Sequence, residues 1–210
     1  MSTLTAAVNL DLITVKPYGK QLAFLLVGGA AVAVALRQPG AALPMAAVYA
    51  TLFASYPFAV GDKADLAMLA GMLPVARRTI VLARYVFAVI ACILGQVVGL
   101  ACCAVIALAS GTTIDPASTA TLVGVSFALF AITAGIQLPL YLALGYARAR
   151  LLGMVPFFAV FVLVGAVSSQ LPDDASTPTW LVGAGAFAVG IATLAASCAV
   201  SVRIYERRQL

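Results

Sequence analysis

Long apolar runs alternate with short polar stretches along this chain. Six runs stand out, and they cover Leu22–Leu36, Leu43–Val60, Ile80–Ala109, Leu122–Tyr146, Val155–Gln170 and Trp180–Val202. A transmembrane helix needs about 20 apolar residues, and lipid offers no partner for an open backbone group. The pattern therefore predicts an all-α membrane protein with six transmembrane helices. The first run is short, and its flanking Lys20 and Arg37 would reach the membrane surface by snorkelling.

The composition agrees with a membrane protein built as one domain. Of the 210 residues, 64% are hydrophobic and 9% are charged, whereas soluble domains carry about 25% charged residues. The first 21 residues are more polar, and we expect them to lie along the membrane surface ahead of the first span. They lack the positive and apolar order of a cleaved signal sequence. Residues 1–210 are therefore expected to form a single transmembrane domain.

Basic residues collect on one side of this predicted topology. With six spans and both ends on the same side, that side carries Lys16, Lys20, Lys63, Arg77, Arg78, Arg84, Arg148, Arg150, Arg203, Arg207 and Arg208. The other side carries Arg37 and three aspartates. The positive-inside rule then places both termini and the polar segment after the second span in the cytoplasm. Orientation and anionic membrane lipids explain the net charge of +5 without a nucleic-acid partner.

Residues 61–85, GDKADLAMLAGMLPVARRTIVLARY, are too polar for lipid and too long for a simple connection. Their first part predicts a short cytoplasmic amphipathic helix between spans two and three, in which Asp62 and Asp65 suit the positive N-terminal end. Its apolar ridge would be formed by Leu66, Leu69 and Leu73, with Met68 and Met72 beside them. Pro74 ends that helix, and a second helix is expected to begin near Ala76 and to enter the membrane.

Two interpretations fit this segment. In the first, it is an interfacial helix whose leucines rest among lipid headgroups while its arginines bind phosphate. In the second, it is a docking element whose Leu/Met ridge fits a groove on a soluble partner. Basic interfacial helices are common, so physical chemistry alone favours the first interpretation.

A sequence motif favours the second interpretation. From Leu73 to Tyr85 the chain reads LPVARRTIVLARY, with the acidic Asp62 and the short helix before it. This pattern resembles the second cytoplasmic segment of permease subunits in ABC type-2 exporters. The tail SVRIYERR, residues 201–208, is similar to the end of the same permeases. Ala76 departs from the Ser or Thr common at its position, so the entering helix lacks a hydroxyl cap worth about 1 kcal/mol.

The resemblance implies a membrane-spanning permease subunit of an ATP-driven exporter in the bacterial cytoplasmic membrane. In such a transporter two permease chains, identical or different, form a dimer, and each engages a separate cytoplasmic ATPase subunit. ATP would be bound on that partner subunit, and this chain would bind no cofactor. Residues 61–79 would form the coupling segment, with contacts to the ATPase from Asp62, Asp65, Leu66, Leu69, Met72, Leu73, Arg77 and Arg78.

Missing residue types exclude several kinds of chemistry. The chain has no histidine, which removes the common zinc-protease motifs and the Ser-His dyads. It also has no phosphate-binding loop of the Gly-x-x-x-x-Gly-Lys-Ser/Thr type, so ATP hydrolysis would need another chain. The four cysteines all lie in apolar runs and are interpreted as free thiols that pack as small hydrophobic residues. We therefore expect neither an enzyme nor a metal site.

A few polar side chains lie inside the predicted spans. They are Gln96 in the third span and Ser126, Thr133 and Gln137 in the fourth, and Gln96, Thr133 and Gln137 are the candidates for lining a substrate path. The simpler explanation for each is a hydrogen bond between helices, worth about 0.6 kcal/mol on average. Because the spans offer mainly apolar surface, the expected substrate is amphipathic or peptide-like.

The third span carries two further features. Arg84 is expected to snorkel back to the headgroups, with Tyr85 at the membrane interface. A small residue recurs at every fourth position, at Ala91, Gly95, Gly99 and Cys103. Such a stripe lets a neighbouring helix approach closely, and packing within the subunit is favoured over a dimer contact.

Other functions remain open at the level of the sequence. A stand-alone immunity or binding protein would sequester a membrane-active peptide without ATP. An ion-coupled carrier would usually need an acidic or basic group at mid-depth, and no Asp, Glu or Lys lies there in the predicted spans. An intramembrane enzyme is the least favoured, because no acid pair, histidine or activated nucleophile is available.

Overall fold

The computed structural model describes residues 3–20, 27, 34, 39–63, 76–152 and 179–207. Every regular element in these ranges is a helix, as the all-α prediction requires. The longer helices are α1 (Thr3–Val15), α3 (Ala42–Lys63), α5 (Arg77–Ser110), α6 (Pro116–Leu144) and α8 (Thr179–Arg207). Short 3-10 helices, η1 (Lys16–Tyr18) and η2 (Pro39–Ala41), follow α1 and precede α3, and residues 146–152 are also helical.

Four of the described helices, α3, α5, α6 and α8, are long and apolar enough to cross a membrane. They correspond to the second, third, fourth and sixth predicted spans. The first and fifth predicted spans, residues 22–36 and 155–170, fall almost entirely outside the described residues. The helical class of the prediction is confirmed, whereas the count of six spans stays a prediction.

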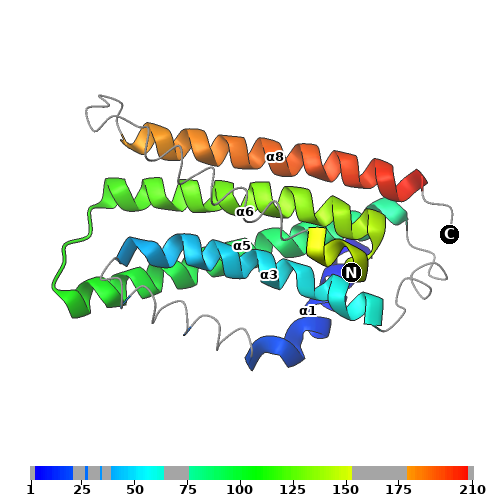
Figure 1. Ribbon diagram of the computed structural model, residues 1–210, viewed down its shortest axis with the longest axis horizontal. Coiled ribbons are helices and arrows are strands. Elements are labelled where there is room, and N and C mark those ends of the chain that lie inside the picture. The colour runs from blue at the N-terminus through cyan, green and yellow to red at the C-terminus, as the bar shows by residue number, and fades with distance from the viewer. Residues whose placement is uncertain are drawn as a thin grey trace.

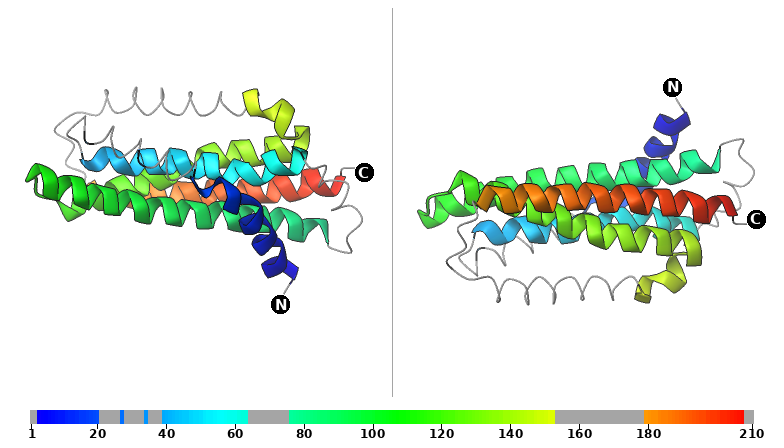
Figure 2. Two further views of the ribbon diagram at one scale, coloured as in Figure 1. Left: turned by 90° about the horizontal axis from the view of Figure 1, so that it is seen from below. Right: turned by 90° about the horizontal axis from the view of Figure 1, so that it is seen from above.

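The four long helices run lengthwise beside one another, and α1 crosses them obliquely (Figures 1 and 2). The α6 helix packs along α8, and α3 packs against both α5 and α6. The α1 helix rests mainly on α5. The last turn of α3, the first turn of α5, residues 146–152 and the last turn of α8 all lie at one end of the bundle, on the right in Figure 1. We call it the basic end, because it carries Arg78, Arg148, Arg150, Arg203 and Arg207.

Local sequence explains where these helices begin and end. Asp115 is the N-cap of α6, and its carboxylate accepts hydrogen bonds from the backbone N–H groups of Ala117 and Ser118 at 3.3 and 2.9 Å. These backbone donors lower the pKa of Asp115. Pro116 follows at the first helical position, where no N–H is needed. At the other end of the same connection, Gly111 takes a left-handed conformation with φ +63°, which ends α5.

The start of α5 matches the sequence prediction. The helix begins at Arg77, directly after Ala76, whose side chain makes no capping hydrogen bond. By contrast, α3 continues to Lys63 and so includes Asp62. Asp62 therefore lies in the last turn of a long helix, and the prediction that it caps the start of a short one is wrong. The predicted amphipathic helix itself falls on residues 64–75, which lie outside the described residues.

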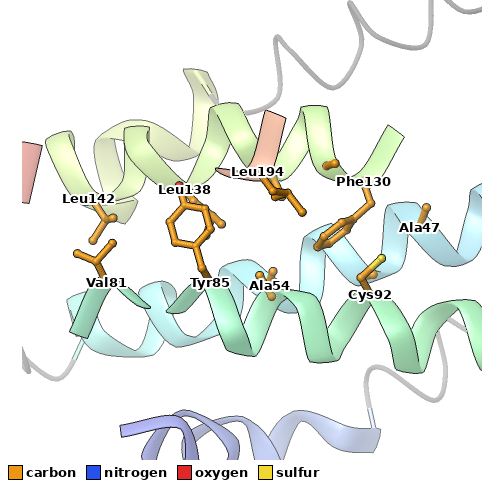
Figure 3. Close-up of a cluster of buried hydrophobic side chains, with 13 residues drawn as sticks. Ala47, Ala54, Val81, Tyr85, Cys92, Phe130, Leu138, Leu142 and Leu194 are labelled. Carbon is orange, nitrogen blue, oxygen red and sulfur yellow. The ribbon is translucent and has the colours of Figure 1, made fainter. Parts of the chain in front are cut away.

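The core lies between α3, α5 and α6, with α8 closing one side. Figure 3 shows its buried side chains, in which alanines of α3 face larger residues of α5 and α6. Val81, Phe130 and Leu138 are among its most deeply buried members, at 0 to 2% exposure. The large apolar side chains left exposed on α5 and α8 point out of this bundle, as expected for helices whose outer faces meet lipid or another chain.

Small residues set the distance between helices. A Cβ atom on Gly95 would lie 3.1 Å from the carbonyl oxygen of Ala46, and one on Gly99 would lie 2.9 Å from the Ala46 Cβ. The small-residue stripe of α5 therefore packs against α3 of the same chain, as predicted. A second close approach joins α6 to α8, where a Cβ on Gly124 would clash with the carbonyl oxygen of Gly183. No pattern in the sequence had predicted this second contact.

Candidate functional site

A buried ion pair joins α1 to the beginning of α5. The Arg84 Nη1 lies 2.8 Å from the Asp11 Oδ1, and the two side chains are 18% and 6% exposed. Burial raises the pKa of Asp11, and the charge of Arg84 opposes that rise. Arg84 therefore pairs within the protein, and the prediction that it snorkels to the headgroups is wrong. An arginine in an apolar helix needs an opposite charge, and α1 supplies it across the helix interface.

The same guanidinium begins a row of aromatic contacts. The Arg84 Cζ lies over the Phe58 ring of α3 at 4.8 Å from its centroid, within the range of a cation–π interaction. The Phe58 ring lies 5.5 Å from that of Tyr141 on α6, which in turn lies 5.3 Å from Tyr146. Contacts therefore lead from the start of α5 across α3 to the end of α6 and into residues 146–152.

The next residue, Tyr85, binds α8 and is buried, so its predicted place at the membrane interface is also wrong. Its hydroxyl lies 2.6 Å from the Ser197 Oγ and 2.7 Å from the Ser201 Oγ. Ser197 itself donates to the carbonyl oxygen of Gly135 on α6 at 2.6 Å. With that proton committed, Tyr85 donates to Ser197 and Ser201 donates to Tyr85. One directional chain of hydrogen bonds therefore links α5, α6 and α8.

Asp62 makes a fourth connection at this end of the bundle. Its carboxylate accepts a hydrogen bond of 2.9 Å from the backbone N–H of Ala147. Residues 146–152 are helical after Gly145, which adopts φ +79° beside the same carboxylate. An acceptor near the first N–H groups of a helix satisfies donors that have no partner within it. Asp62 therefore caps this helix from the end of α3.

These contacts converge on the first turns of α5, and we name the group the α5 junction. It consists of Asp11 from α1, Phe58 from α3, Arg84 and Tyr85 from α5, and Ser197 and Ser201 from α8. It lies a short way inside the basic end, next to the point where residues 64–75 connect α3 to α5. Because these residues link α5 to α1, α3 and α8, a displacement of the start of α5 would be transmitted to each of these helices.

Comparison with known protein families identifies the chain. A family model described as ABC-2 family transporter protein matches residues 8–206. The chain belongs to this family. Comparisons with curated proteins and with solved structures found no match. Membership and the four long apolar helices together make it a multi-pass membrane protein of a transport system.

The predicted coupling residues of this ABC-2 protein are only partly described. Asp65, Leu66, Leu69, Met72 and Leu73 lie outside the described residues. Arg78 is exposed in the first turn of α5, directly after Arg77. Asp62 is exposed at the end of α3 and contacts Ala147. The structure thus places both borders of the segment at the basic end of the bundle.

The candidate path residues lie in the interior but do not form one lining. Thr133 is buried, and its hydroxyl donates to the carbonyl oxygen of Leu129 one turn earlier in α6 at 2.7 Å. Gln137 is half-buried. Gln96 is 9% exposed, and neither its amide nitrogen nor its amide oxygen has a hydrogen-bond partner among the described residues. The hydroxyl of Thr133 is therefore satisfied within its own helix, not by the expected bond between helices, whereas the unpartnered amide of Gln96 still requires an explanation.

Metal binding finds no support in the described part of the chain, which contains no cluster of three or more potential metal ligands. The four cysteines are free thiols, as their positions in apolar runs predicted.

Several residues of the junction were missed by sequence reasoning, although their signals were present. Asp11 is the one charged residue among Leu10, Leu12 and Ile13. An isolated charge in an apolar helix usually pairs with an opposite charge. On α8, Gly183, Gly190 and Ser197 recur every seven residues, which marks a helix-packing seam of small residues. Which partner each one meets follows only from the tertiary structure.

Proposed function

We propose that this ABC-2 family protein is the membrane-spanning permease of an ATP-driven exporter. In this proposal residues 61–79 are the coupling segment, a separate cytoplasmic ATPase binds the ridge that includes Leu69 and Leu73, and a second permease chain completes the substrate path. Family membership supports the transport role. The location of both borders of the segment at the basic end supports a contact with a cytoplasmic partner.

The observation that carries the proposal is the α5 junction. The first turns of α5 are held to α1 by an ion pair, to α3 by a cation–π contact and to α8 by hydrogen bonds. Packed helices move as rigid bodies and slide on one another, whereas a flexible connection absorbs motion. A push on the segment before Arg77 would therefore tilt α5 together with its neighbours.

The expected substrate is an amphipathic or peptide-like molecule exported from the bacterial cytoplasm. The long helices expose apolar side chains along α5 and α8, for example Ile93, Val97, Phe187 and Ile191. An amphipathic molecule can follow such a surface without the loss of solvation that a compact ion would suffer.

Docking of the ATPase is tested with a ridge variant. In Leu69→Asp combined with Leu73→Asp, we expect co-purification of the ATPase from detergent extracts to be lost, because two carboxylates cannot enter an apolar groove without partners. The protein should still insert and purify. Normal co-purification with this variant would contradict the coupling role and would favour a stand-alone binding or immunity protein.

Transmission is tested with Tyr85→Phe, by the same co-purification combined with a measurement of transport and ATP hydrolysis. This variant removes one hydroxyl of the junction and leaves the surface of the segment unchanged. We therefore expect the ATPase to co-purify normally while transport per ATP hydrolysed falls. Tyr49→Phe is the matched control, because Tyr49 is half-buried on α3 and lies outside the junction. Equal transport by the Tyr85 and Tyr49 variants would show that the junction does not carry the motion.

A further inference from the structure

Two buried polar side chains in the middle of the bundle lack hydrogen-bond partners among the described residues. They are Gln96 on α5, whose nitrogen and oxygen are both unpartnered, and Ser126 on α6, whose hydroxyl is unpartnered. The two residues are 9% and 1% exposed. Buried polar groups in native proteins are nearly always satisfied, by protein or by a bound molecule. Each of these two therefore requires an explanation.

The register of α5 against α6 brings the two residues to the same level. In Figure 3, Val81 faces Leu142, Tyr85 points toward Leu138, and Cys92 lies near Phe130. The two helices thus run in opposite directions along the core. One helical turn beyond Cys92 on α5 is Gln96, and one turn before Phe130 on α6 is Ser126. Both unpartnered groups therefore belong to the same layer of the bundle.

This layer lies far from either end of the helices. At 1.5 Å per residue, Gln96 is about 27 Å from Arg78 and about 21 Å from Ser110 along α5, and Ser126 is about 15 Å from the start of α6. The α3 residues nearest this level are small, with Ala47 and Ala50 buried in the same cluster. Alanine side chains offer neither polar group a hydrogen-bond partner.

We propose that Gln96 and Ser126 form an internal binding site for a neutral hydroxyl group. A glutamine amide offers donors and an acceptor, and a serine hydroxyl offers one donor and two lone pairs, so together they match a group that both donates and accepts. An ion does not suit the site, because neither residue carries a compensating charge and burial of an unpaired ion is very unfavourable. The hydroxyl comes from a water molecule or from the transported molecule.

A shared ligand makes a distinctive prediction for stability. The protein in lipid nanodiscs is compared by thermal unfolding with Gln96→Leu, Ser126→Ala and the double variant. If one group bridges both side chains, either single change removes most of the site, and the second change adds little. We expect the midpoint shift of the double variant to differ from the sum of the single shifts by about 2–4 °C.

If Gln96 and Ser126 share no ligand, the unfolding midpoints should change in the opposite way. Each change would then remove an unsatisfied polar group, each would raise the midpoint, and the two shifts would add. Additive shifts overturn the proposal. Gln96→Met repeats the cycle with an unbranched side chain, in case leucine packs poorly. Thr51→Val is the control, because the buried Thr51 hydroxyl already donates to the carbonyl oxygen of Val48 at 2.6 Å.

Radiolytic hydroxyl labelling then distinguishes the two sources, with water itself as the probe. Side chains beside a bound internal water are oxidised despite their burial. If water fills the site, Phe130 and Cys92 label faster than the equally buried Phe87 and the buried Cys103, and the double variant abolishes the excess. A coupled cycle without excess labelling assigns the hydroxyl to a transported molecule that stays bound through purification, a source that rests on the proposed function. The unfolding test requires no ATPase, so it stands or falls separately from the transport role.

Discussion

At the scale of single residues, the pairing of Asp11 with Arg84 explains how a charged side chain is accommodated in an apolar helix. Neither residue is favourable in its own surroundings, because each charge is largely removed from water. Their contact at 2.8 Å compensates for part of that loss, and the Phe58 ring contributes on the α3 side. The pair therefore fixes where α1 sits on α5.

Two variants test this ion pair. Arg84→Gln leaves the Asp11 carboxylate buried without its counter-charge, so we expect the free energy of unfolding to fall by about 3–5 kcal/mol. Replacement of both residues by apolar ones, Asp11→Leu with Arg84→Met, should restore most of that loss, because no buried charge remains. Thermal unfolding in detergent measures both. If the double variant is as unstable as Arg84→Gln alone, the ion pair is not the main contact.

At the scale of whole elements, glycines decide how closely the helices approach. The α6 and α8 helices touch at Gly124 and Gly183 and again where Gly190 meets the ring of Phe127. Close backbone contact of this kind gains packing energy in a membrane, where lipid tails are as apolar as the side chains. The seam also brings Ser197 and Ser201 to Tyr85, so the junction depends on it.

An added methyl group tests the close contact between α6 and α8. Gly124→Ala places a Cβ against the carbonyl oxygen of Gly183, and the two helices must then separate. We expect a loss of about 1–3 kcal/mol from overpacking, measured as a lower unfolding midpoint. Gly185→Ala is the matched control, because nothing lies within 4 Å of the position that its Cβ would take. Equal midpoints for the two variants would contradict the seam.

At the scale of the whole molecule, charge is distributed unequally between the two ends of the bundle. Arginines gather at the basic end, where they lie in residues 146–152 and in the last turns of α8. The α5–α6 connection at the other end carries Asp115. Charge asymmetry of this kind sets orientation during insertion. The basic end is therefore expected to face the cytoplasm, where a coupling segment would meet an ATPase.

Cysteine labelling tests this orientation. In a variant whose four native cysteines are replaced by alanine, Thr113→Cys and Arg148→Cys place single exposed thiols at opposite ends of the bundle. A membrane-impermeant maleimide should label Cys at position 113 in intact cells, and at position 148 only after permeabilisation. The reverse result would put the coupling segment outside the cell, and the proposed function would fail.

Much of the fold could be predicted from the sequence, because lipid imposes its demands on each segment separately. The helical class, four helices long and apolar enough to cross a membrane, the start of α5 after Ala76 and the inward-packing stripe of Gly95 and Gly99 are all confirmed. The candidate site was harder to predict. Arg84 and Tyr85 were placed at the membrane surface by general rules for their residue types, and both of them are bound inside the protein instead.

The sequence by itself determined which segments are helices, which of them can cross a membrane and which charges gather between them, since these properties follow from hydropathy and spacing along the chain. The tertiary structure decided that Arg84 meets Asp11 and that Tyr85 meets Ser197 and Ser201. It also set the register of α5 on α6, in which Cys92 lies near Phe130. The reason is geometric. A polar group in an apolar helix requires a partner, and only the register of one helix on another specifies which residue that partner is.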